Sequence, residues 1–132
     1  MNALLESKLA ALMRQHAKLR VALLFGSLAH GRERVDSDLD VAVAGLAPLT
    51  LEDRAQLIGE LATLTGRPVD LIDLTTCDGP VRAEALSRGR LIHCTDRGLY
   101  ADLIRRVLYD EADFMPYRRR ILAERRRAWT HG

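Results

Sequence analysis

Two apolar runs in the first third of the chain constrain its fold more than any other feature. One covers residues 20–25, the other covers residues 39–44, and a short polar connector separates them. Runs of this length match buried strands and are too short for typical helices. Gly26-Ser27 follows the first run directly, as expected where a strand ends in a tight turn. Because so short a connector favours antiparallel neighbours, we predict an antiparallel strand pair.

Two carboxylates, Asp38 and Asp40, lie at the start of the second run. Residues two apart in a strand point to the same face of a sheet, so these side chains are expected to project together. Neighbouring carboxylates repel each other unless a cation lies between them. Mg²⁺ suits such a site because it prefers hard oxygen ligands, often one or two carboxylates with substrate phosphates. The alternative is a strand pair with an acidic edge and no cation.

Beyond this region the chain alternates between helical and strand patterns. The expected elements are a helix over residues 3–15, strands over 20–25 and 39–44, a helix from Thr50 to about Thr65, a strand over 68–74, a short helix from Asp78 to near Gly89, a strand over 90–94 and a helix from 96 or 97. Helices separate the later strands, so we predict a small mixed sheet of about four strands with helices mainly on one side. This is an α+β (mixed α/β) fold.

Length and composition indicate one globular domain. A chain of 132 residues with 48% hydrophobic residues is long enough for one core. We expect a single domain over residues 1–132, with its core at about 18–95 and a helical, Arg-rich segment at about 97–130. No apolar run approaches the roughly 20 residues of a membrane helix. The first residues lack the order of a signal peptide, so a cytoplasmic location without membrane contact is expected.

The basic residues are concentrated at the C-terminus. Residues 118–132 contain six Arg and one Glu, although the whole chain has a net charge of only +2. Three interpretations remain open: a solvated basic helix face, a docking surface for an acidic protein, and a nucleic-acid surface. Nucleic acid is the least favoured, because Tyr117 and Trp129 are the only nearby aromatic residues that could stack on bases.

The segment from Gly26 to Asp40 resembles a known family signature. It reads GSLAHGRERVDSDLD, which is Gly-Ser, ten residues at positions 28–37, and Asp-x-Asp. This pattern is similar to the nucleotidyltransferase signature of the DNA polymerase beta superfamily, and most similar to its minimal nucleotidyltransferases (MNT proteins). The resemblance implies the nucleotidyltransferase fold, Gly26 and Ser27 as nucleotide-binding residues, and Asp38 and Asp40 as catalytic metal ligands.

A third carboxylate is expected from the later strand, where Asp70 and Asp73 are both candidates. Residues three apart face opposite sides of an ideal strand, so only one of them can join the cluster. The flanking residues do not separate the two well. The family's third aspartate lies in a Val-Asp-Leu strand after the intervening helix, and this resemblance implies Asp70. Asp38, Asp40 and Asp70 would then bind one or two Mg²⁺ ions.

The Gly-Ser pair has a physical rationale of its own. Gly26 has no Cβ and lets phosphate approach the backbone closely. The Ser27 hydroxyl and the following N–H groups could bind an anion, although Ser27 could equally serve as a helix N-cap.

One departure from the family pattern follows the pair. MNT proteins often carry a basic residue at the position of Leu28 or His30, and this chain does not. Phosphate contacts are therefore expected from Arg32 or Arg34 instead.

The resemblance also implies a biological role. MNT proteins often pair with HEPN-domain RNases as toxin–antitoxin systems, in which the antitoxin transfers AMP from ATP to a tyrosine of its toxin. A cognate HEPN toxin and ATP are thus the expected partners. Two alternatives remain open: a non-catalytic antitoxin that acts by occlusion, and an adenylyltransferase for a small molecule such as an aminoglycoside. The expected carboxylate cluster argues against occlusion, since a pure binding module does not need it.

Overall fold

The computed structural model describes residues 3–26, 38–77 and 79–109. Its elements are α1 (Ala3–Arg14), β1 (Val21–Phe25), β2 (Leu39–Ala44), α2 (Leu51–Thr65), β3 (Val69–Asp73), α3 (Gly79–Arg88), β4 (Arg90–Cys94) and a further helix over residues 97–109. The expected order of helices and strands is confirmed. None of the helices in these three segments is long and apolar enough to cross a membrane.

The four strands form one mixed sheet in the order β3-β2-β1-β4. β1 is antiparallel to both β2 and β4, which confirms the predicted antiparallel pair. β2 and β3 are parallel, and α2 makes the crossover between them. The two apolar runs are thus the central strands, and every residue of β1 is buried.

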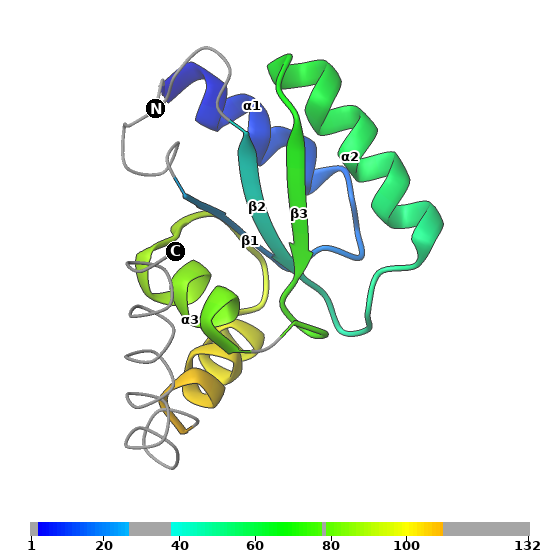
Figure 1. The fold of residues 1–132 in the computed structure, drawn as a ribbon. Helices are drawn as coiled ribbons and strands as arrows, with labels where there is room; N and C mark the ends of the chain where they lie inside the picture. Colours follow the sequence, from blue (N-terminus) through cyan, green and yellow to red (C-terminus); the bar gives the residue numbers. More distant parts are fainter. Residues whose placement is uncertain (1–2, 27–37, 78, 110–132) are drawn as a thin grey trace, which may run out of the picture.

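The helices cover both faces of the sheet (Figure 1). On one face, α1 and α2 contribute the buried residues Leu9, Met13, Leu57 and Leu61. On the opposite face, α3 and the helix over residues 97–109 contribute Ala85, Leu86, Leu103 and Val107. The expectation of helices mainly on one side is therefore wrong. The helices lie on both sides because the central strands carry apolar residues on both faces of the sheet, and both faces must be shielded from water.

The crossover helix α2 has well-defined ends. Thr50 is its N-cap, and the Thr50 hydroxyl accepts a 3.0 Å hydrogen bond from the backbone N–H of Asp53. Gly66 ends the helix in the left-handed conformation (φ 66°) and donates its N–H to the carbonyl of Ala62. Both ends agree with the sequence prediction, and they return the chain to β3 beside β2.

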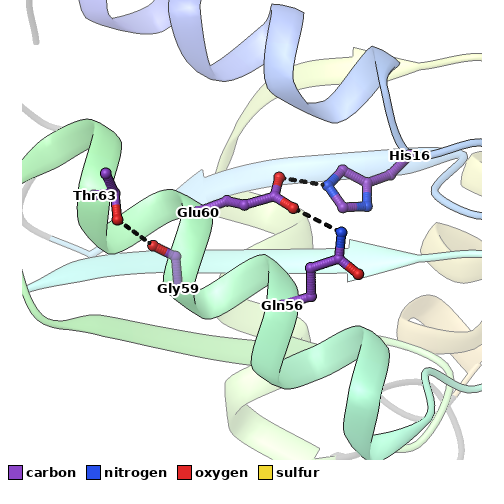
Figure 2. Close-up of polar contacts among 5 residues, drawn as sticks. All are labelled: His16, Gln56, Gly59, Glu60 and Thr63. Carbon is purple, nitrogen blue, oxygen red and sulfur yellow. Dashed lines mark hydrogen bonds and ion pairs between the residues drawn. The ribbon is translucent and has the colours of Figure 1, made fainter.

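A polar contact connects α2 to the residues that follow α1 (Figure 2). His16 Nε2 lies 2.9 Å from Glu60 Oε2, and Gln56 Nε2 donates to Glu60 Oε1 at 2.9 Å. The contact with His16, and to a smaller extent that with Gln56, lowers the pKa of the Glu60 carboxyl. Both members of the His16–Glu60 pair are partly exposed, so its contribution to stability is modest.

We expect Glu60→Gln to destabilise the protein by about 0.5 kcal/mol at neutral pH, as partly exposed pairs do. A carboxyl whose pKa is lower in the folded state stabilises the fold above its ordinary pKa of 4.5 and loses this effect as the pH falls through the lowered value. The difference from wild type should therefore vanish in acid. Urea unfolding across this pH range measures it. A double-mutant cycle with His16→Gln is the control, and zero coupling at neutral pH would contradict the assignment.

Candidate active site

The site is built around a close approach between Gly26 and Asp40. Gly26 directly follows β1 and has a φ of +73°, in the left-handed region where a side chain is strained. A Cβ at this position would collide with Oδ2 of Asp40. The register of the strands explains the contact, because Phe25, the last residue of β1, pairs with Asp40 on β2. The carboxylate thus occupies the space that a side chain at position 26 would fill.

Asp70 lies beside Asp40 on the neighbouring strand. The two residues are register partners in the parallel pairing of β2 with β3. Their side chains share one face, since Val41 and Leu71, the next residues on each strand, point into the core on the other face. Asp40 is half-buried and Asp70 is exposed. The register therefore places two carboxylates next to each other at the solvent boundary.

The charges around Asp40 affect its protonation. Partial burial is the first cause that raises the pKa of Asp40 above its usual value. The nearby charges of Asp70, Asp38 and Glu84 raise this pKa further, in that order. Asp38 is exposed and directly precedes β2, which begins at Leu39 as predicted, so it is not part of the strand itself. The structure nevertheless brings Asp38 and Asp70 near Asp40.

Asp73, the competing candidate, has a different environment. Only 3% of its surface is exposed, and its register partner is Val43, on the face that α1 and α2 cover. Its carboxylate accepts hydrogen bonds from the backbone N–H of Leu49 at 2.8 Å and from the N–H and hydroxyl of Thr75 at 2.9 and 2.7 Å. Asp73 therefore fixes the loops at the end of β3, and Asp70 is the residue that lies beside Asp40.

The other residues singled out from the sequence lie outside the described segments. These are Ser27, Leu28, His30, Arg32, Arg34 and the Arg-rich stretch at 118–132. Sequence reasoning missed Glu84, an exposed residue of α3. No sequence pattern indicates that Glu84 belongs near the site, because only the packing of α3 brings it near Asp40.

The donor set is suited to Mg²⁺ in chemical type. Asp38, Asp40 and Asp70 offer only oxygen ligands. Burial raises the pKa of Asp40 first, and the charges of Asp70 and Asp38 add a repulsion that a cation would relieve. Within residues 3–26, 38–77 and 79–109, no three or more His, Cys, Asp or Glu side chains are grouped so that they could hold a metal ion. Mg²⁺ commonly uses one or two carboxylates and completes its shell with water and phosphate, so a closed protein cage is not required.

One groove among the described residues lies away from these carboxylates. It has a volume of about 840 Å³ and runs between α1 and α2, on the opposite face of the sheet. Its lining includes Ala11, Leu12 and Gly59, and its acidic residue Glu60 is already paired with His16. The charge pattern therefore favours the Asp40 region as the site of chemistry.

We expect Asp40→Asn to raise the thermal stability by a few degrees at neutral pH without divalent cations. A carboxyl whose pKa is raised in the folded state costs stability when ionised, and this cost disappears as the pH falls through the raised value and then below 3.8. The increase in melting temperature caused by Asp40→Asn should therefore become smaller as the pH falls over this range. Thermal unfolding of both proteins at several pH values measures the difference. A variant that is less stable than wild type at neutral pH would contradict the repulsion.

Gly26→Ala should destabilise the protein by about 1–3 kcal/mol, because it adds backbone strain and a collision with Asp40. Asp40→Ala in the same chain should recover part of the loss by removing the colliding carboxylate. Denaturant unfolding of both single variants and the double variant gives the coupling. If the changes in the free energy of unfolding of the two single variants simply added up in the double variant, the contact between Gly26 and Asp40 would be contradicted.

Comparisons with known proteins identify a family for this chain. The family model described as polymerase beta nucleotidyltransferase matches residues 7–98. The protein adenylyltransferase MntA of Shewanella oneidensis (strain MR-1) is 31% identical over 98 residues, which are 74% of this chain and 70% of MntA.

Two solved structures extend the likeness to the fold. One chain of a toxin–antitoxin crystal structure with AMP-PNP has a TM-score of 0.77 and 25% identity, covering 90% of this chain and 96% of that chain. One chain of the tri-AMPylated Shewanella oneidensis HEPN toxin in complex with MNT antitoxin has a TM-score of 0.68 and 25% identity, with coverages of 92% and 99%. With the sequence match from α1 to β4, these findings show that the chain belongs to the polymerase beta nucleotidyltransferase family.

Proposed function

We propose that this protein is a Mg²⁺-dependent antitoxin that transfers AMP from ATP to a tyrosine of a cognate HEPN-domain RNase toxin. The observation that carries the proposal is the arrangement of Gly26, Asp40 and Asp70, with a backbone turn directly beside two paired carboxylates. This arrangement supports the proposal because a glycine turn, whose backbone lacks a side chain, lies next to oxygen ligands suited to a cation.

The residues of the site would have different roles in nucleotidyl transfer. Asp38, Asp40 and Asp70 would hold Mg²⁺, which when bound neutralises the triphosphate and orients the attacking and leaving oxygens. Gly26 and Ser27 would bind the phosphates. In the reaction the acceptor oxygen bonds to the α-phosphorus of ATP and loses its proton, while the bond to the β-phosphate oxygen breaks and pyrophosphate leaves.

The relatives support ATP and a protein as substrates. MntA is named a protein adenylyltransferase, and the two solved structures contain AMP-PNP in one case and an AMP-modified toxin in the other. The likeness covers at least nine-tenths of this chain and almost all of each matched chain. The shared fold therefore extends well beyond the Gly-Ser and Asp-x-Asp motif, which supports a shared mode of action.

The test is incubation with Mg²⁺ and ATP labelled at the α-phosphate, with and without the HEPN protein encoded beside this one. Label should appear on a tyrosine of that protein. Asp40→Asn and Asp70→Asn should each lower the rate by about 10³-fold, since metal-ion stabilisation contributes several kcal/mol to such reactions. Asp102→Asn is the matched control, because Asp102 is an exposed aspartate paired with Arg105 on the helix over residues 97–109.

The alternatives predict different outcomes. Occlusion predicts that the double variant Asp40→Asn, Asp70→Asn still inhibits the toxin and that no label is transferred. A small-molecule transferase predicts label on an aminoglycoside and none on the neighbouring protein. Either result would overturn adenylylation of the toxin.

A further inference from the structure

The groove between α1 and α2, the α1–α2 groove, is formed mainly by small and apolar residues. They are Ala11 and Leu12 on α1, and Ala55, Gly59 and Leu64 on α2. All five are at least partly exposed, so the groove is open to solvent. An exposed apolar surface of this size is suited to contact with another protein.

Gly59 lies in the interior of α2, where the packing of the described residues does not require a glycine. Its φ is not in the left-handed region, and a Cβ at this position would meet no atom within 4 Å. A glycine inside a helix makes the helix less stable than an alanine would. What the missing side chain provides is room for a second surface to approach the helix backbone closely.

The polar side chains around Gly59 are already hydrogen-bonded within the protein (Figure 2). Gln56 donates to Glu60 at 2.9 Å, and the other carboxylate oxygen of Glu60 lies 2.9 Å from His16 Nε2. The hydroxyl of Thr63 donates to the carbonyl of Gly59 at 2.8 Å. Because these groups keep their partners when water leaves, covering the groove with another protein surface carries only a small desolvation cost.

Opposite charges lie at the two ends of this surface. Lys8 lines the groove from α1, and Glu52 lies one helical turn before Gln56 on α2. Both side chains are exposed, and neither forms an ion pair or a hydrogen bond with a residue that the structure describes. The helices run antiparallel, since Lys18, which follows α1, contacts Asp53 in the first turn of α2 (Figure 1). Lys8 therefore lies beside the second half of α2, away from Glu52.

We propose that the α1–α2 groove is the interface between two copies of this chain, related by a two-fold axis that runs across the helices. Such an axis reverses the helix direction between the copies, so Lys8 of each copy faces Glu52 of the other. Leu51, which is 85% exposed beside Glu52, then packs at the end of the other groove that Leu64 lines.

Charge complementarity favours a second copy over a different protein as the occupant. One surface supplies both members of each ion pair, which is the self-complementarity that a two-fold interface needs. The dimer also leaves the proposed active site uncovered, because Asp40 and Asp70 lie on the face of the sheet that α3 covers. The inference therefore goes beyond the proposed function and does not rest on it.

The experiment measures association of the full chain alone, by sedimentation velocity at a series of protein concentrations and low ionic strength. The wild type should pass from monomer to dimer as the concentration rises. Lys8→Glu and Glu52→Lys should each raise the dissociation constant at least about tenfold, because both ion pairs of the dimer become repulsive. The double variant should return to within about threefold of the wild type, because it restores both pairs with reversed signs.

Gly59→Gln tests the groove itself. Glutamine is a good helix former and the position has room for it, so the melting temperature in dilute solution should equal or exceed that of the wild type. Its side chain would fill the groove and raise the dissociation constant at least about tenfold. Asp102→Lys is the control for charge reversal and should leave association unchanged, since Asp102 is exposed on the helix over residues 97–109, which covers the opposite face.

Three results would overturn the inference. One is a wild type that stays monomeric at every concentration, and another is a dimer that Gly59→Gln leaves intact. The third is a double charge reversal that associates no better than the single ones, which would exclude the pairing of Lys8 with Glu52. If the single reversals weaken toxin binding by a monomeric antitoxin, the occupant of the groove is the toxin and a second copy is ruled out.

Discussion

The antiparallel pairing of β1 with β2 is the constraint on which the rest of the structure depends. Both strands are apolar on both faces, so each face must be covered, and helices from before and after them in the chain supply the cover. The same register ends with Phe25 opposite Asp40. One pairing thus accounts for the two-sided architecture and for the contact between Gly26 and the carboxylate.

Asp40 and Asp73 show how position in a sheet determines the role of a carboxylate. Asp73 is nearly fully buried, but three donors from Leu49 and Thr75 satisfy its oxygens. Asp40 is less buried, yet its partial burial and then the charges of neighbouring acidic groups raise its pKa. A satisfied carboxylate stabilises loops, whereas a cluster of repelling ones costs stability until a cation binds. Such a local cost is typical of residues placed for chemistry.

Local patterns in the sequence predicted much of this structure. Apolar runs, Thr50 and Gly66 identified the strands and the ends of α2, because these signals depend on nearby residues only. The expectation that the helices lie mainly on one side of the sheet was wrong, since the side on which a helix packs depends on contacts between distant segments. The choice between Asp70 and Asp73 needed the family resemblance at first, and the register of β2 with β3 then resolved their positions. Glu84 could not be found, because only tertiary packing brings it to Asp40.

Acidic side chains have different environments on the two faces of the sheet. On the α1–α2 face, acidic groups have partners, as Glu60 has in His16 and Asp53 has in Lys18. On the face of α3, Asp40 lies among like charges. Acid therefore has opposite effects on the two carboxyls. Protonation of Glu60 removes a favourable contact, whereas protonation of Asp40 removes the cost of its partly buried charge and the repulsion by its neighbours. The buried contacts of Leu57 and Leu61, which hold α2 on the sheet, are apolar and do not depend on the charge of Asp40.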